Sequence, residues 1–241
     1  MPEVGKSVSI VVPTYNERDN VQPLCEGIRW ALEPIWDYEI IIVDDNSPDG
    51  TQGVVRRLAE EDPRIKLLQR PGKLGLGSAV AAGFAVASGD YWVMMDADLS
   101  HRPEDLPNLL NALSEADIVV GSRYVPGGGV VNWPLSRKIA SRGASALGRL
   151  IVGLQVRDLT SGFGAFRRGH TEALLPTLNP KGFKLLLEIL AKSDNARVKE
   201  TPITFVDRQH GRSKASAREA LVFLRLCFEL RGHRRGHWRG S

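Results

Sequence analysis

The chain has 241 residues, of which 42% are hydrophobic, and this size and composition suit one large α/β domain better than two. Its two cysteines, Cys25 and Cys227, match no metal-ligand spacing, which argues against a disulfide framework or a structural zinc site and favours a reducing cytosol. The first apolar run, residues 8–12, is too short for a signal peptide. The longest apolar candidate, residues 79–87, falls far short of the roughly 20 residues that a membrane span needs, so we expect a soluble or peripheral protein.

The net charge of +4 is unevenly distributed along the chain. Residues 1–120 hold 10 Lys/Arg and 20 Asp/Glu, whereas residues 121–241 hold 22 and 8. An acidic half suits a divalent cation and, through it, a diphosphate, whereas a basic half suits anionic lipid, a lipid phosphate or nucleic acid. The alternative is that these charges are only a solvated surface.

Short β-branched or aromatic segments alternate with helical patterns through the first half. The predicted strands are residues 7–12, 38–43, 65–69, 91–95 and 117–120, and the predicted helices are residues 18–32, 51–61, 76–87 and 103–113. Pro103 suits the first turn of the last of these helices. This alternation predicts a mostly parallel central sheet covered by helices on both faces, with ligands bound beyond the carboxyl ends of the strands.

Polar clusters follow four of these strands directly. They are residues 13–17, 44–47, 96–98 and 121–123. Because the carboxyl ends of parallel strands share one edge of a sheet, we expect the four clusters to converge on a single crevice.

Asp96 and Asp98, separated by one residue at a strand end, form a pattern that binds a hard cation together with diphosphate oxygens. Alone this pattern is weak, because Ser100 and Pro103 also fit a helix-capping loop. Residues 73–78 place glycines before a helix and suit either a phosphate contact or a flexible turn, but they lack the order of a P-loop.

The second half predicts a glycine-rich loop at 127–129, helices at about 136–152, 182–192 and 216–230, and one strand near 198–206. Lys138, Arg142 and Arg149 share one face of the first helix, and the last helix has a broad apolar surface. With the basic tail and Trp238, these features predict contact with a membrane plane; core packing is the alternative for the apolar residues. We expect one domain over residues 1–230 and a basic, disordered tail over residues 231–241.

Along nearly its whole length the sequence resembles the dolichol-phosphate (polyprenyl-phosphate) mannosyltransferases of glycosyltransferase family 2. The resemblance rests on six segments in the family's order: residues 11–18, 44–50, 95–101, 121–124, 137–143, and 205–208 with 211–214. It implies a GT-A (Rossmann-like) three-layer α/β/α fold, a GDP-mannose donor, a dolichyl or other polyprenyl phosphate acceptor, and Mg²⁺ or Mn²⁺ as cofactor.

The resemblance also implies roles for individual residues. The implied nucleotide-sugar contacts are Pro13, Tyr15, Glu17, Val43, Asp45, Asp96, Ala97 and Asp98. Arg123, Arg208 and Lys214 correspond to the diphosphate and sugar clamp, and Asp96, Asp98, Arg123 and Arg208 to the catalytic set. Arg137 and Ser141 correspond to acceptor-phosphate contacts.

The sequence departs from the family pattern in two places. Some members have a glutamine metal ligand where this chain has Ser100. The resemblance implies Asp98 as the main metal ligand, with Asp96 and the Ser100 hydroxyl beside it. Because a hydroxyl is a weaker and shorter ligand that water is able to replace, we expect weaker metal binding. Some members carry C-terminal membrane-spanning helices that have no counterpart in this sequence. We therefore expect peripheral attachment to the cytoplasmic face of an anionic membrane through the amphipathic helices, a small membrane-anchoring subunit, or both, and no nucleic acid partner beyond the donor nucleotide.

A phosphate monoester is already a nucleophile at neutral pH, so the predicted reaction needs no general base, and we expect a single displacement that inverts the anomeric carbon. Three alternatives remain open at this point. They are the same transfer from another donor such as UDP-glucose, a nucleotidyltransferase that makes the sugar nucleotide, and a non-catalytic module that binds RNA or membrane.

Overall fold

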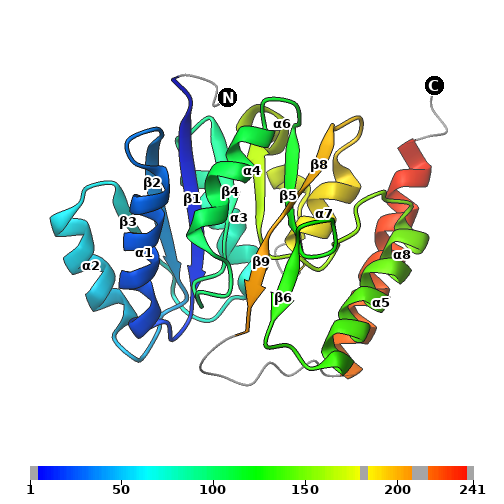
Figure 1. The fold of residues 1–241 in the computed structure, drawn as a ribbon, viewed down its shortest axis with the longest axis horizontal. Coiled ribbons are helices and arrows are strands. Elements are labelled where there is room, and N and C mark those ends of the chain that lie inside the picture. The colour runs from blue at the N-terminus through cyan, green and yellow to red at the C-terminus, as the bar shows by residue number, and fades with distance from the viewer. Residues whose placement is uncertain (1–4, 180–183, 208–216, 238–241) are drawn as a thin grey trace.

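The computed structural model describes residues 5–179, 184–207 and 217–237. A seven-stranded sheet runs through the molecule in the order β3-β2-β1-β4-β7-β5-β8 (Figure 1). Its strands are β1 (Ser7–Thr14), β2 (Asp37–Asp44), β3 (Ile65–Gln69), β4 (Tyr91–Met94), β5 (Ile118–Ser122), β7 (Gly164–Arg167) and β8 (Val198–Pro202). Only β7 among them is antiparallel to its neighbours, so the predicted mostly parallel central sheet is confirmed.

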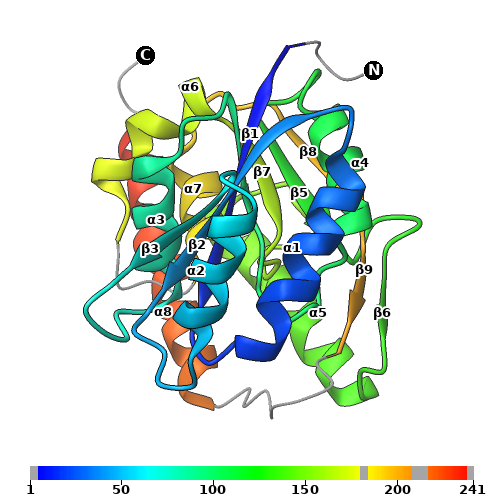
Figure 2. The same ribbon diagram turned by 90° about the vertical axis from the view of Figure 1, so that its left-hand side faces the viewer.

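Helices cover both faces of this sheet, which gives three layers (Figure 2). One face carries α1 (Arg18–Leu32), α2 (Thr51–Glu61), the short η1 (Pro103–Asp105) and α4 (Leu106–Ala112). The other carries α3 (Leu76–Val86), α5 (Leu135–Val152), α7 (Leu185–Lys192) and α8 (Ala217–His237), with α6 (Arg168–Thr171) and η2 (Glu172–Thr177) near its edge. The predicted bounds of α1 and α2 are confirmed.

The central strands are buried on both faces because their side chains alternate between two hydrophobic clusters. In β1, Ile10 and Val12 pack with α1, whereas Val11 packs with α3. In β2, Ile42 packs in the same cluster as Ile10 and Val12, whereas Val43 packs in the same cluster as Val11. This double burial explains why both strands read as continuous apolar runs.

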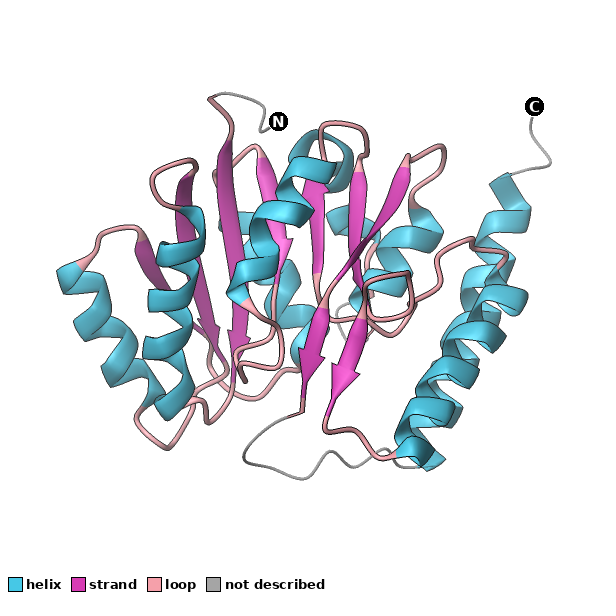
Figure 3. Cartoon of the chain, viewed as in Figure 1, coloured by secondary structure: helices cyan, strands magenta, loops and turns pink. Residues whose placement is uncertain are grey.

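The carboxyl ends of β1, β2 and β4 meet at one edge of the sheet, where the arrowheads gather at the lower edge of Figure 3. Thr14 pairs with Asp44, and Val11 pairs with Met94. The loops that leave these strands therefore start side by side. This is the position from which ligand sites of open α/β sheets are built.

The single strand predicted near residues 198–206 is wrong, because the structure divides it between two sheets. After β8, the strand β9 (Thr204–Val206) pairs with β6 (Gly129–Val131) in a separate two-stranded sheet. Pro202 has no N–H to donate to a ladder, so it suits the end of β8. Ile203 then donates its N–H to the carbonyl of Ser122, which turns the chain toward β6.

The last helix also differs from its prediction, since α8 continues to His237 instead of ending near residue 230. A basic sequence suits this position because the carboxyl end of a helix carries the negative end of its dipole. α8 packs against α5 along the edge of the molecule (Figure 1). Across residues 5–179, 184–207 and 217–237, none of the helices combines the length and apolar character that crossing a bilayer requires.

Candidate active site

Two neighbouring pockets open at the carboxyl edge of the sheet and share Pro13, Leu76 and Asp96. We call the first the Tyr15 pocket. Its lining residues are Pro13, Thr14, Tyr15, Glu17, Asp45, Lys73, Gly75, Leu76, Ala79, Asp96, Ala97 and Asp98. Three of the four predicted polar clusters thus meet around one pocket. The fourth, residues 121–123, lines neither pocket.

The loop after β2 divides its two aspartates between different roles. Asp44 is fully buried and its carboxylate accepts hydrogen bonds from the Thr14 hydroxyl and from the N–H and hydroxyl of Ser47. The Ser47 hydroxyl in turn accepts the N–H of Asn16, whose φ of 61° places it in the left-handed region. Asp44 therefore fixes the shape of two loops, whereas Asp45 faces the pocket.

Asp45 anchors the segment that forms the opposite wall of the Tyr15 pocket. One carboxylate oxygen accepts Nε of Arg70 at 2.5 Å, and the other accepts the N–H groups of Leu74 and Gly75 at 3.0 and 3.1 Å. Arg70 and Asp45 are both more than nine-tenths buried. Because the ion pair is charge-assisted and buried, it holds the wall rigidly against the end of β2.

Lys73 extends from this wall over the ring of Tyr15, with its Nζ 3.9 Å from the ring centroid. This cation–π contact joins the loop after β1 to the segment before α3. Lys73 is the one cation among the described residues that line the Tyr15 pocket, and Glu17, Asp45, Asp96 and Asp98 are its acidic residues. A diphosphate entering such a pocket needs further positive charge, as a metal ion would supply.

The loop after β4 presents the two carboxylates predicted to hold a metal. Asp96 and Asp98 both line the Tyr15 pocket, and an oxygen of Asp98 accepts the N–H of Ser100 at 3.0 Å. The Ser100 hydroxyl is buried and has no hydrogen-bond partner among the described residues. No three His, Cys, Asp or Glu side chains gather as a metal cluster within the described ranges. A hard cation bound by Asp96 and Asp98 would take its remaining ligands from diphosphate and water.

His101 supports this loop from beneath. Its ring is stacked on Phe163 with centroids 5.1 Å apart, and its Nδ1 accepts the N–H of Asp96 at 3.2 Å. Burial lowers the pKa of His101 below its usual value, against the opposing effect of the nearby Asp96 and Asp98 carboxylates. The imidazole is therefore neutral, with its proton on Nε2.

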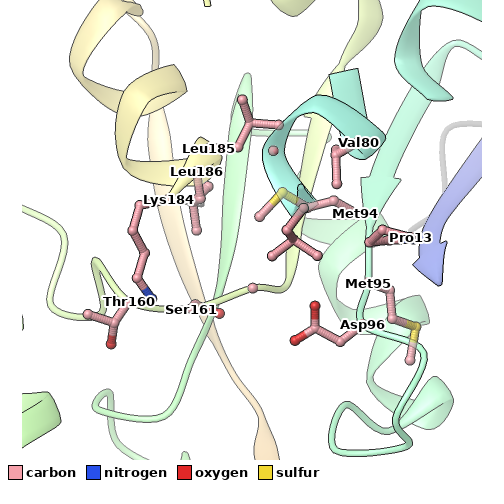
Figure 4. A pocket seen from close by; sticks show the side chains of 13 residues that line it. Pro13, Val80, Met94, Met95, Asp96, Thr160, Ser161, Lys184, Leu185 and Leu186 are labelled. Atoms are coloured by element: carbon pink, nitrogen blue, oxygen red, sulfur yellow. The ribbon is translucent and has the colours of Figure 1, made fainter. Parts of the chain in front are cut away.

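We call the second pocket the Lys184 pocket (Figure 4). Its lining residues are Pro13, Leu76, Gly77, Val80, Met94, Met95, Asp96, Thr160, Ser161, Gly162, Lys184, Leu185 and Leu186. A Cβ placed on Gly162 would lie 2.9 Å from a carboxylate oxygen of Asp96, so a larger residue here would require the Asp96 side chain or the loop to shift. Sequence patterns did not indicate a role for this loop at the site, because its position depends on the pairing of β7 with β4 and β5.

Arg123 lies in a buried ion pair behind this loop. Its Nε and Nη2 each donate to a different carboxylate oxygen of Asp158 at 2.7 Å, and Nη2 also donates to the Thr160 hydroxyl at 2.7 Å. Burial alone would lower the pKa of Arg123, but the hydrogen bonds that it donates to Asp158 and the charge of that carboxylate outweigh burial and hold the pKa above its usual value. Arg123 lines neither pocket, and its connection to the Lys184 pocket is the hydrogen bond that it donates to Thr160. Its implied role in holding the diphosphate and sugar stays a prediction.

The predicted acceptor residues, Arg137 and Ser141, lie one turn apart on α5. Arg137 donates to Asp207 at 2.6 Å, and its guanidinium lies 4.0 Å from the ring centroid of Trp133. The Ser141 hydroxyl accepts from the Tyr124 hydroxyl at 2.7 Å and lies 3.1 Å from the Thr160 hydroxyl. Thr160 therefore connects Ser141 to the Lys184 pocket.

The remaining predicted residues divide into two groups. Val43 is fully buried in β2 and lines neither pocket, so its side chain faces the core. Arg208 and Lys214 lie outside the described residues. The structure adds Arg70, Lys73, Thr160 and Lys184 to the surroundings of the site. Of these, only Lys73 lies in a segment for which the sequence suggested a phosphate contact.

The family model for glycosyl transferase family 2 matches residues 9–175. The chain is 44% identical over 226 residues to the dolichol-phosphate mannosyltransferase of Pyrococcus furiosus, covering 92% of this chain and 63% of that protein. It is 41% identical over 215 residues to the undecaprenyl-phosphate mannosyltransferase of Micrococcus luteus, covering 87% of each. The chain thus spans about two thirds of the first relative and most of the second.

Solved structures of glucosyl-3-phosphoglycerate synthase from Mycobacterium tuberculosis share the fold. The complex with phosphoglyceric acid superposes with a TM-score of 0.70 at 20% identity, covering 97% of this chain and 81% of that one. The complex with Mn²⁺, UDP-glucose and phosphoglyceric acid gives a TM-score of 0.68 over the same shares. The sheet order, the layers and the family match agree with the predicted GT-A fold. The chain belongs to glycosyl transferase family 2.

Proposed function

We propose that this protein transfers mannose from GDP-mannose to a polyprenyl phosphate, giving polyprenyl β-mannosyl phosphate and GDP, with Mg²⁺ or Mn²⁺ as cofactor. The observation that carries the proposal is the placement of Asp96, which borders both the Tyr15 pocket and the Lys184 pocket. A donor whose nucleoside lies in the first pocket would present its diphosphate at Asp96 and its sugar toward the second. The names of the relatives from P. furiosus and M. luteus support mannose and a polyprenyl phosphate as substrates.

In this proposal the metal would be held by Asp98 and Asp96, and the Ser100 hydroxyl of the same loop would be a weaker third ligand. When bound, the metal neutralises diphosphate charge and so makes GDP a better leaving group. Tyr15, Glu17 and Asp45 line the pocket in which the nucleoside would lie. Asp45 contributes chiefly by fixing the wall that carries Lys73, since its oxygens already accept Arg70, Leu74 and Gly75.

The acceptor phosphate attacks the anomeric carbon from the side of the Lys184 pocket. The bond from the anomeric carbon to the acceptor oxygen forms while the bond to the diphosphate oxygen breaks, and the electron pair leaves with GDP. The acceptor is mostly dianionic at neutral pH because its second pKa is about 6, so no side chain has to take a proton. The neutral, buried His101 is consistent with a role in supporting the loop. A displacement of this kind inverts the anomeric carbon.

Arg137 and Ser141 would bind the acceptor phosphate at the entrance to the Lys184 pocket. Support comes from the hydroxyl of Thr160, which lies 3.1 Å from Ser141 and whose residue lines that pocket. The side chains of Arg137 and Asp207 are each about one-quarter exposed. A phosphate that reaches this pair from solvent is therefore able to compete with Asp207 for the guanidinium. The predicted clamp residues Arg208 and Lys214 would act on the donor side.

The acceptor is confined to a membrane, and α5 and α8 offer an apolar surface with which to reach it. The exposed large apolar residues of these two helices are Leu135, Ile139, Leu147, Leu150, Leu221, Val222 and Phe228. Lys138, Arg142 and Arg149 lie along α5 beside them. Apolar insertion and attraction to anionic lipid act together, so we propose peripheral attachment to the cytoplasmic face through this surface, alone or with a small anchoring subunit.

Donor competition tests the proposed specificity. Transfer of labelled mannose to polyprenyl phosphate is measured with increasing unlabelled GDP-mannose, GDP or UDP-glucose. We expect GDP and GDP-mannose to compete at concentrations about tenfold or more below that of UDP-glucose, because the Tyr15 pocket, in which the nucleoside would lie, would discriminate between guanine and uracil. Stronger competition by UDP-glucose, together with transfer of labelled glucose, would assign the protein to a different donor.

A further inference from the structure

Lys184 lies in a position from which its ammonium group is able to bind an anion in the Lys184 pocket. It directly precedes α7, and Figure 4 shows its side chain extending toward Thr160 and Ser161, which line the same pocket. Residues 185–191 of α7 are all buried, so the helix that carries Lys184 is anchored in the core. The cation is therefore held on a rigid support, as a substrate-binding group requires.

The charges of the pocket fit this role. Among its described lining residues, Lys184 is the one cation and Asp96 is the one carboxylate. The proposed function, on which this inference rests, brings a diphosphate and an acceptor phosphate to the same anomeric carbon. Two anions that approach each other need fixed positive charge between or beside them, and such charge has its largest effect in a water-poor site.

Lys192, the last residue of α7, connects neighbouring elements of the fold. Nζ of Lys192 donates to an oxygen of Glu188 at 2.6 Å and to the carbonyl oxygen of Thr177, so it ties α7 to η2. It lines neither pocket. Lys184 lines the same pocket as Thr160, whose hydroxyl accepts from Arg123 and lies near that of Ser141.

We propose that Lys184 is a further substrate-binding residue whose ammonium group contacts a phosphate oxygen in the Lys184 pocket. That oxygen belongs either to the donor diphosphate or to the acceptor phosphate, which share the same chemistry. Lys184 thereby adds the start of α7 to a site otherwise built from the strand-end loops, the start of α3, the loop before β7 and α5.

The test compares Lys184→Met, which keeps length without charge, and Lys184→Arg, which keeps charge. Lys199→Met is the matched control, because Lys199 is an exposed lysine paired with Glu115 at the start of β8. For each protein, calorimetry measures the affinity for GDP with Mn²⁺ and for a short-chain polyprenyl phosphate in detergent. Steady-state assays then give kcat and KM for both substrates of the transfer.

We expect Lys184→Met to lose about tenfold in kcat/KM, Lys184→Arg to recover most of the loss, and Lys199→Met to match wild type. Weaker GDP binding would assign the contact to the donor diphosphate, and weaker lipid-phosphate binding to the acceptor. If Lys184→Met stays within twofold of wild type in every measurement, or Lys184→Arg is equally impaired at equal thermal stability, the proposal is overturned. Failure of the wild type to transfer mannose would instead contradict the proposed function, and the two titrations would still test Lys184.

Discussion

The guanidinium of Arg123 and the carboxylate of Asp158 form a two-point ion pair, with both hydrogen bonds 2.7 Å long and both side chains at least nine-tenths buried. Asp158 also accepts the backbone N–H of Arg123 and the hydroxyl of Thr160. The pair therefore holds together the end of β5 and the loop that lines the Lys184 pocket.

We predict that Asp158→Asn lowers the free energy of unfolding by about 3 kcal/mol or more, because it leaves the Arg123 charge buried without its counterion. Chemical denaturation measures this loss. Glu115→Gln, which removes an exposed pair with Lys199, serves as control and should leave the unfolding midpoint unchanged. A midpoint for Asp158→Asn as high as that of the control would show that the pair is dispensable for stability.

Gly162→Ala should impair transfer more than it impairs folding. The added Cβ would lie 2.9 Å from an oxygen of Asp96, so the carboxylate or the loop has to move. Small displacements of reacting groups are costly, and we expect a drop in transfer rate of about tenfold or more. Gly169→Ala, where a Cβ meets nothing within 4 Å, is the control. Equal transfer rates for the two variants would mean that transfer does not require the position of Asp96 between the two pockets.

Glu39 provides a pH dependence of stability that is separate from the active site. Burial alone would raise its pKa, but hydrogen bonds from Lys66, Ser9 and Ser88 outweigh burial and lower the pKa to about 2. The ionised carboxylate therefore stabilises the fold fully above the unfolded-state pKa of about 4.5, and this contribution is lost as the pH falls toward 2. Unfolding of wild type and Glu39→Gln from pH 7 to pH 2 should show a stability difference that shrinks below about pH 4.5. A difference that is constant over this range would contradict the assignment.

The apolar surface of α5 should control attachment to membranes. Ile139→Glu with Leu150→Glu should reduce sedimentation with anionic liposomes, because it replaces insertion by charge repulsion, and added salt should weaken wild-type binding. Trp30→Glu is the matched control, since Trp30 is an exposed apolar residue on α1. If the double variant and the control bind equally, attachment depends on α8, on the predicted basic tail or on another subunit.

The elements of the first half were predictable because their strands are buried on both faces and their helices have clear periodicity. The Asp45, Asp96 and Asp98 side chains follow such strands, so their convergence on one pocket followed from the parallel topology. Arg70, Thr160 and Lys184 were not predictable in this way. Their places depend on long-range contacts, namely the pairing of Arg70 with Asp45 and the antiparallel insertion of β7 between β4 and β5.

The second half was less predictable because its backbone changes direction at residues whose effect depends on their neighbours. Pro202 ends β8 and lets residues 204–206 join β6, which a single apolar pattern does not reveal. Arg123 was assigned to substrate from resemblance alone, whereas the structure shows that its guanidinium is bound by Asp158. Asp158 lies 35 residues from Arg123 in the sequence, so local sequence patterns do not reveal this ion pair.

We propose that this protein transfers mannose to a lipid phosphate in a reaction that depends on a metal ion and inverts the anomeric carbon. The most direct measurement incubates the protein with GDP-[¹⁴C]mannose and a polyprenyl phosphate, with Mn²⁺ or Mg²⁺ or with a chelator, beside the variants Asp98→Ala and Asp194→Ala. Asp194 is an exposed residue between α7 and β8 and serves as control. We expect a labelled lipid whose mannose is β-linked by proton NMR. The lipid should form only with metal, be lost in Asp98→Ala and be retained in Asp194→Ala. An α-linked product, equal transfer in the presence of chelator, or no labelled lipid from the wild type would contradict it.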